Sequence, residues 1–299
     1  SFLFSVTLAG AEGGSRDLIA QIPRWEEAST LEAALAAGPQ DATREEHRVL
    51  SAVAAMVAGS DDPGLAAVPV LAYLPELNAV VTDRIDVAPL RMRLAGPAGA
   101  AAVAAAGRWL QRFHTEVGEE RPAAFDAGSV VAALERAAVD LGPRRAPAPC
   151  VRLAALSERG SDLQGHSALH AGLHGDFNLA NVMVDRCGRV AVLDPNMDWG
   201  PAAADTAKFL TALRMRRVRA LTLGLIGSRN LADLEAVFLR NSGVQDDGLL
   251  GFLRAAATLE RWIETERRVE RSSRLSPLRG AFVVVRRHFA SEADALLGV

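Results

Sequence analysis

The segment HGDFNLANVMVDRCGRVAVLD, residues 174–194, decides the fold of this chain. Its first part is a polar loop, and two short runs rich in valine follow at 182–184 and 190–193. The DRCG sequence between the runs, at 185–188, contains the aspartate and glycine that are typical of tight turns. Apolar β-branched runs on either side of such a turn predict a β-hairpin.

Three oxygen-bearing side chains flank this predicted hairpin. Asp176 and Asn181 precede its first strand, and Asp194 ends its second strand. A carboxylate such as that of Asp176 can take a proton from an attacking hydroxyl, whereas Asn181 and Asp194 can hold a hard cation such as Mg²⁺ through oxygen. These groups are suited to phosphoryl transfer, in which catalysis consists mainly of positioning and neutralising phosphate charge.

The order and spacing of these residues resemble the aminoglycoside phosphotransferase and choline kinase family, in which His-Gly-Asp is followed, after four residues, by Asn. The resemblance implies an α+β, two-lobed protein-kinase-like fold, with a small β-rich lobe and a larger, mainly helical lobe. It also implies that ATP is the phosphate donor, that Asp176 is the catalytic base and that Asn181 and Asp194 bind magnesium. His174 is expected to support the loop structurally. The alternative interpretation is a solvated, Asp-rich hairpin without this chemistry.

The composition is that of an ordinary globular protein. Of the 299 residues, 49% are hydrophobic and 23% are charged, and the net charge is −3. This slightly negative charge does not indicate binding to nucleic acid or to a membrane surface. No apolar run is long enough to span a bilayer. The first ten residues lack a basic region and are interpreted as a strand rather than a signal peptide. Cys150 and Cys187 are too few for a disulfide framework, so we expect a cytoplasmic protein.

The N-terminal part, residues 1–86, is predicted to be the small nucleotide-binding lobe. Apolar periodicity predicts two strands, a helix and a further strand, at 2–8, 18–22, 43–57 and 77–85. Thr43 is a candidate N-cap for the helix. The Glu12-Gly13-Gly14 segment is either a plain hairpin turn or a backbone cradle for phosphate.

The end of the last of these strands is the expected adenine site. In the resembled family, this strand runs into a hinge whose backbone contacts adenine. By position, the resemblance places the hinge at 82–85, so we expect the backbone of Asp83 and Ile85 to meet the adenine edge.

The expected phosphate clamp departs from the family pattern. The family places a basic residue on the small-lobe strand and pairs it with a helix glutamate. In this chain the basic position falls on Gln21, with Glu46 as the best partner and Glu45 as a close alternative. A glutamine can donate a hydrogen bond but carries no charge. Arg16 or Arg24, at either end of the strand, is the alternative source of positive charge.

Residues 87–299 are predicted to form the larger lobe. Helices are expected at 98–113, 129–141, 203–215, 231–241, 246–271 and 277–297, and the Pro-rich segment at 142–149 is expected to be a loop. The helices after residue 230 would line the acceptor site. Their many arginines suit an anionic acceptor if several of them point inward.

Three further residues near the hairpin are candidates for the site. Asp205 lies where the family has a carboxylate that accepts hydrogen bonds from the catalytic loop, although the surrounding sequence matches the family only in part. Asp198 and Trp199 follow Asp194 closely and are possible contacts for the acceptor. The alternative is that Asp198 is solvated and Trp199 belongs to the core.

The histidines at 166, 170 and 174 raise a different possibility. A spacing of four residues would place three imidazoles on one face of a continuous helix, which could build a zinc site. The resemblance predicts instead that the chain leaves any helix near Gly172 and Gly175, which would scatter the three rings.

We therefore predict an ATP-dependent phosphotransferase that acts on a hydroxyl of a small-molecule acceptor, such as an antibiotic, an amino alcohol or a sugar. The alternative is a catalytically weakened, kinase-like binding or regulatory protein, which Gln21 favours. The sequence specifies neither ATP over GTP nor an oligomeric state.

Overall fold

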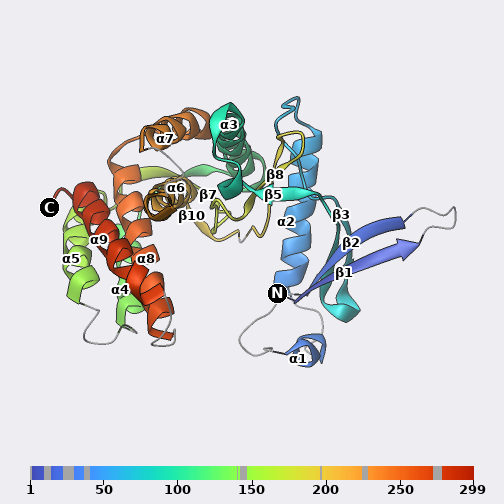
Figure 1. Ribbon diagram of the computed structural model, residues 1–299, viewed down its shortest axis with the longest axis horizontal. Coiled ribbons are helices and arrows are strands. Elements are labelled where there is room, and N and C mark those ends of the chain that lie inside the picture. Colours follow the sequence, from blue (N-terminus) through green and yellow to red (C-terminus); the bar gives the residue numbers. More distant parts are fainter. Residues whose placement is uncertain are drawn as a thin grey trace. The chain divides into compact units, whose positions relative to one another are not determined.

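The computed structural model of the chain describes residues 2–9, 15–22, 30–36, 41–139, 141, 147–195, 197–223, 228–271 and 278–299. Their contacts define two compact units, one of residues 1–119 and 174–198 and one of residues 120–173 and 199–299. The ribbon in Figure 1 follows the chain by colour. The first unit extends beyond residue 86 because strands from both of its segments pair with each other. The predicted boundary at residue 86 separates a nucleotide-binding lobe from a larger lobe. This functional division stays a prediction.

The first unit contains a four-stranded antiparallel sheet. Its strands are β1 (Phe2–Ala9), β2 (Ser15–Ile22), β4 (Ala79–Asp83) and β3 (Val70–Leu74), in the order β1-β2-β4-β3. The predicted strands at 2–8 and 18–22 are thus confirmed. The predicted strand at 77–85 is shorter, and β3, which precedes it, was not predicted. The Glu12-Gly13-Gly14 segment lies outside the described residues.

Two helices accompany this sheet. Helix α1 (Leu31–Ala36) was not predicted, and it packs Ala34 against Ile22 of β2. Helix α2 (Asp41–Ala58) confirms the helix predicted at 43–57 and contacts β3 and β4. Thr43 is not its N-cap, because the helix already begins at Asp41 and the Thr43 side chain is buried.

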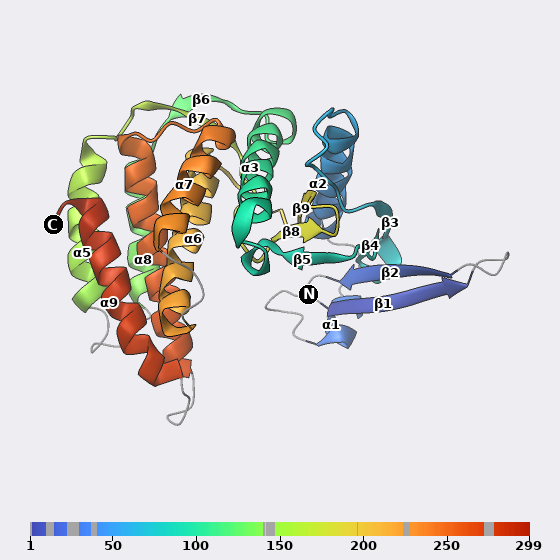
Figure 2. The same cartoon turned by 45° about the horizontal axis from the view of Figure 1, so that its top comes forward.

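The rest of the first unit surrounds the predicted hairpin. Strands β8 (Val182–Asp185) and β9 (Val190–Val192) form it, and β5 (Val87–Pro89) pairs with β8 in an antiparallel sheet of order β5-β8-β9. Helix α3 (Gly96–Arg112), which continues into a π-helical turn at Phe113–Val117, contacts β9. This arrangement confirms the predicted hairpin, which lies beside β5 and α3 in Figure 2.

The second unit is mainly helical. Its helices are α4 (Ala127–Val139), α5 (Pro147–Ser161), α6 (Ala203–Leu223), α7 (Ser228–Ser242), α8 (Gly248–Arg271) and α9 (Leu278–Leu297). Its strands are β6 (Arg121–Ala124), β7 (Ser167–Gly172) and β10 (Trp199–Pro201), in the order β10-β7-β6. Helix α8 packs against α6 and α9, and these helices run side by side in Figure 2. The predicted helices are confirmed, whereas α5 and the three strands were not predicted.

Partly buried ion pairs cross-link the helices of the second unit. Arg214 of α6 contacts Glu235 of α7 at 2.8 Å and also pairs with Glu292 of α9. Arg254 of α8, which is 7% exposed, lies 3.4 Å from the same Glu235. Because each charge is matched by an opposite charge, the burial of these groups is tolerated. Among the helices in the described part of the chain, none is both long and apolar enough to cross a membrane.

The pair between Arg286 of α9 and Glu266 of α8 gives a test of this packing. Glu266 is only 1% exposed and accepts two hydrogen bonds from the guanidinium, at 2.8 and 2.9 Å. Arg286→Met would remove the guanidinium and both of its hydrogen bonds from a buried carboxylate, and should lower the free energy of unfolding by on the order of 3 kcal/mol. The measurement is urea denaturation.

Arg261→Met on α8 is the matched control. Its partner Glu264 is solvent-exposed, so this substitution should cost less than about 1 kcal/mol. Equal losses for the two variants would contradict the assignment of a structural role to the Arg286–Glu266 pair.

Candidate active site

The turn of the β8–β9 hairpin is held by one side chain. Asp185 accepts hydrogen bonds from the backbone N–H groups of Cys187 and Arg189, both at 2.8 Å, and Arg189 also pairs with its carboxylate. Gly188 adopts φ 84°, which favours glycine. Arg189 and Asp185 therefore close a short turn, and the register Val182↔Val192 aligns the strands.

His174 links the start of the loop to the end of the hairpin. The imidazole is fully buried, and its Nε2 lies 2.8 Å from the carbonyl oxygen of Leu193. Trp109, Phe113 and Phe177 surround the ring, with centroids 5.5–6.2 Å away. These contacts tie the start of the loop to the end of the hairpin, and the supporting role of His174 in catalysis stays a prediction.

The carboxylate of Asp176 is exposed and lies between two amides. Asn181 donates from Nδ2 to the Asp176 Oδ2 at 2.9 Å and to the Asp176 carbonyl at 3.0 Å. Asn178 donates from Nδ2 to the Asp176 Oδ1 at 2.7 Å. The sequence reasoning missed Asn178, although an asparagine two residues after an aspartate is a common partner in tight loops.

Asp194 lies in a strained backbone position directly after the hairpin. Its φ is 57°, in the left-handed region that a non-glycine residue occupies only at a cost of roughly 1–2 kcal/mol. The side chain is exposed. Strain of this kind collects at functional sites, because the surrounding structure must hold the residue in place.

Gln21 and Glu46, the predicted phosphate clamp, are in direct contact. The Gln21 Nε2 donates to the Glu46 Oε1 at 2.8 Å, and both side chains are half-buried. Burial, followed by repulsion from the Asp194 carboxylate, raises the pKa of Glu46 to about 7. Glu45, the alternative partner, instead points to Arg48 on the helix surface. The structure thus brings Gln21 together with Glu46.

The expected hinge is anchored by an ion pair. Arg16 of β2 donates to both oxygens of Asp83, at 2.5 and 2.6 Å. The N–H of Asp83 donates to the Pro69 carbonyl at 2.9 Å, so this donor is already used. Ile85 lies between β4 and β5, outside any strand. The expected contact of the Asp83 and Ile85 backbone with adenine stays a prediction.

The remaining candidates belong to different parts of the chain. Asp198, which is exposed, ends the first unit. Trp199 and Asp205 belong to the second unit. Trp199 is 47% exposed, with Arg121 of β6 4.5 Å above its ring, so it is not a core residue. Asp205 is fully buried in the first turn of α6.

Asn181 and Asp194 offer a donor set suited to magnesium. The Nδ2 of Asn181 is directed to Asp176, which leaves its Oδ1 for a cation, and the Asp194 carboxylate faces solvent. Mg²⁺ is commonly held by one or two such oxygens together with substrate phosphates. In the described part of the chain, no group of three or more His, Cys, Asp or Glu side chains could hold a metal. The zinc alternative is wrong, because His170 lies on β7 and not on a continuous helix.

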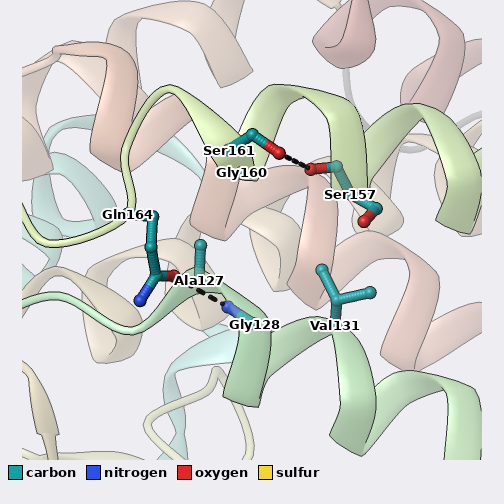
Figure 3. A pocket seen from close by; sticks show the side chains of 7 residues that line it. All are labelled: Ala127, Gly128, Val131, Ser157, Gly160, Ser161 and Gln164. Carbon is teal, nitrogen blue, oxygen red and sulfur yellow. Dashed lines mark hydrogen bonds between the residues drawn. The ribbon is translucent and has the colours of Figure 1, made fainter.

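A small cavity lies elsewhere, between helices α4 and α5 (Figure 3). Its volume is about 280 Å³, and it is lined by Ala127, Gly128, Val131, Ser157, Gly160, Ser161 and Gln164. Gln164 accepts a hydrogen bond from the Gly128 N–H at 3.2 Å, and Ser161 donates to the Ser157 carbonyl at 3.1 Å. None of the lining side chains is charged or belongs to the predicted site, so this cavity is unsuited to phosphoryl transfer.

The chain belongs to the phosphotransferase enzyme family, whose sequence profile matches residues 12–237. This membership makes it a phosphotransferase, and specifically a small-molecule kinase. A search among curated protein sequences found no significant match.

Solved structures show that the fold is kinase-like. A glucosamine kinase in complex with glucosamine, ADP and inorganic phosphate has a TM-score of 0.58 at 16% identity, covering 96% of this chain and 79% of its own. A choline kinase from Streptococcus pneumoniae has a TM-score of 0.56 at 14% identity, covering 96% and 90%. An amicoumacin kinase in complex with AMP-PNP, Ca²⁺ and Ami has a TM-score of 0.53 at 13% identity, covering 98% and 86%. The predicted fold class is therefore confirmed.

The raised pKa of Glu46 predicts a pH dependence of stability. Between pH 4.5 and 7, the unfolded chain loses the Glu46 proton while the folded protein retains it. The free energy of unfolding should therefore fall as the pH rises through this window, by up to about 3 kcal/mol, and then level off. In chemical denaturation at pH 5 and pH 8, Glu46→Gln should lack this decrease.

Glu45→Gln is the control on the same helix. A hydrogen bond from Arg48 lowers the pKa of Glu45, so its removal should leave the decrease in place. A decrease of the same size in Glu46→Gln as in the unaltered protein would contradict the burial of an ionisable Glu46.

Proposed function

We propose that this kinase transfers the γ-phosphate of Mg-ATP to a hydroxyl of a small molecule. The observation that carries the proposal is the carboxylate of Asp176, which is exposed to solvent yet held at both oxygens by amides. A base must reach its substrate and must also keep a fixed orientation. Asp176 meets both conditions.

The chemical step follows from these positions. Asp176 accepts the proton of the acceptor hydroxyl, whose oxygen forms a bond to the γ-phosphorus while the bond to the β–γ bridging oxygen breaks. The nucleoside diphosphate leaves with that oxygen. Asn181 and Asp194 would hold magnesium, which when bound neutralises phosphate charge. ATP as the donor is supported by the nucleotides bound to the similar kinases.

The nucleotide would be held mainly by the first unit. We assign the phosphate contacts to Gln21, paired with Glu46, and the adenine contacts to the carbonyl of Asp83 and the N–H of Ile85. His174 and Asp205 would support the loop without touching substrate. Consumption of ATP suits a cytoplasmic location, which forms part of the same proposal.

The acceptor is an alcohol, and its class is the open part of the proposal. The similar kinases are named for glucosamine, choline and amicoumacin. Three arginines of α8 have partners within the protein, so they do not support an anionic acceptor. Arg254 forms an ion pair with Glu235, and Arg261 forms one with Glu264. Arg267 donates a hydrogen bond to the Ala137 carbonyl. Asp198 and Trp199 remain candidates for acceptor contacts.

Calorimetric titration with Mg-ATP, followed by a screen of glucosamine, choline and aminoglycosides for ADP release, tests the proposal. Binding together with acceptor-dependent ADP release is the expected result. Binding without release from any of these alcohols or from water would favour the alternative of a weakened, kinase-like binding protein, which the neutral Gln21 indicates.

Asp176→Asn should separate catalysis from binding. The substitution removes the base but preserves the shape of the side chain, so transfer should fall about a hundredfold to ten-thousandfold. The nucleotide dissociation constant should stay nearly unchanged. Asp194→Ala should instead weaken nucleotide binding only when Mg²⁺ is present, which titration in EDTA would reveal. Full activity of Asp176→Asn would exclude Asp176 as the base.

Gln21→Lys tests the charge of the phosphate clamp. A charged donor to phosphate is about twice as strong as a neutral one, so the new ammonium, paired with Glu46, should tighten Mg-ATP by roughly 1–3 kcal/mol. Arg16→Ala should cost little affinity, because Arg16 is engaged with Asp83. Nucleotide titrations of both variants and of Arg24→Ala should be compared. A large loss in either arginine variant, with no gain from lysine, would show that a guanidinium already fills the clamp.

A further inference from the structure

Asn178 is the one partner of the Asp176 carboxylate that neither the resembled motif nor the metal site explains. It lies two residues after Asp176, in the part of the loop between His-Gly-Asp and Asn181. Its Nδ2 approaches the Asp176 Oδ1 to 2.7 Å, which is the shorter of the two side-chain hydrogen bonds that Asp176 accepts from the amides. Hydrogen bonds to an ionised acceptor are short and strong.

Both ends of the Asn178 amide are used, which fixes its orientation. The Oδ1 accepts a hydrogen bond from the Ala180 N–H at 2.7 Å, so the Nδ2 must face Asp176. The carbonyl of Asn178 also accepts the N–H groups of Asn181 and Val182, at 3.2 and 3.0 Å. The side chain is therefore anchored to the same turn that delivers Asn181.

The two amides donate hydrogen bonds to different oxygens of the Asp176 carboxylate. Asn178 holds Oδ1, and Asn181 holds Oδ2. Asn181 alone would leave the carboxylate of this exposed Asp176 free to rotate about its Cβ–Cγ bond, because a single bonded oxygen does not define the plane. With both oxygens held, each retains one lone pair in a fixed direction.

We propose that Asn178 is a positioning residue for the catalytic base, which orients the Asp176 carboxylate toward the acceptor hydroxyl. This role rests on the proposed function, in which Asp176 takes the hydroxyl proton. Asn178 touches neither the nucleotide nor the acceptor in this role, so it should act on turnover and not on binding. A displacement of a reacting group by about 1 Å can cost a hundredfold in rate.

Two substitutions separate this role from a purely structural one. Asn178→Asp and Asn178→Ser both retain an oxygen that can accept the Ala180 N–H and preserve the turn. Neither offers the amide donor to Asp176, and the serine variant adds no charge beside it. Asn178→Ala, which loses both contacts, reports the cost of losing the turn as well.

The experiment measures kcat, the acceptor KM and the Mg-ATP dissociation constant for the three variants. The acceptor is the alcohol found in the screen, or water with ADP release as the readout where no alcohol reacts. We expect kcat to fall about tenfold to a hundredfold in the aspartate and serine variants. The acceptor KM and the nucleotide dissociation constant should stay within about twofold, because the substitutions remove no contact to either substrate.

The possible failures are distinguishable. If the unaltered protein releases no ADP with any alcohol or with water, the proposed function fails. If it is active and Asn178→Asp and Asn178→Ser retain its kcat while Asn178→Ala does not, Asn178 only shapes the turn and the positioning role is wrong. A parallel loss of nucleotide binding in the serine variant would also overturn the proposal.

Discussion

The hydrogen bond between the His174 imidazole and the Leu193 carbonyl is the constraint on which the rest of the site depends. It joins the first residue of the catalytic loop to the residue before Asp194, across the full length of the hairpin. Since the ring is fully buried among Trp109, Phe113 and Phe177, the bond is shielded from competing water. Because a carbonyl only accepts, Nε2 must carry the proton, and His174 acts here as a fixed donor. The bond thereby ties the loop that carries Asp176 to the end of the hairpin that carries Asp194.

The strained backbone of Asp194 comes directly after this hydrogen-bonded residue. The carbonyl of Leu193 is committed to His174, and its N–H donates to the Asn181 carbonyl at 3.0 Å. The chain turns at the next residue, Asp194, whose φ is 57°. A glycine would adopt φ 57° at less cost, but it could not supply a carboxylate. The strain at Asp194 is therefore the consequence of requiring an acidic side chain at a turning point.

Local patterns in the sequence were sufficient to predict the hairpin and most of the helices. The valine runs around the turn at 185–188 predict β8 and β9, and the turn is closed locally, because the Asp185 side chain accepts two of its backbone N–H groups. Strand β10 was missed, since three residues, Trp199–Pro201, carry no periodicity and pair only with the distant β7. Helix α5 was missed because its prolines lie at its start, where a missing N–H is harmless. Tertiary pairing, rather than propensity, decides such segments.

In the candidate site, too, some residues were predictable from the sequence motif and others only from their contacts in the structure. The motif placed Asp176, Asn181 and Asp194 in sequence, whereas Asn178 became evident only when its amide was seen against Asp176. The pairing of Gln21 with Glu46 could be anticipated only through family resemblance, since 25 residues separate them.

The Gln21–Glu46 contact shows which part of the clamp this chain has kept. A lysine at this position has two tasks, to pair with the helix glutamate and to neutralise phosphate. The glutamine amide performs the first at 2.8 Å and cannot perform the second. The single lysine of the chain, Lys208, lies on α6 and approaches Glu260 to 3.8 Å. Burial, followed by the Asp194 carboxylate, raises the pKa of Glu46, and the neutral Gln21 amide adds no positive charge to oppose this. In the proposed clamp, Gln21 thus keeps the helix–strand hydrogen bond to Glu46, and the neutralisation of phosphate charge would fall to other cations.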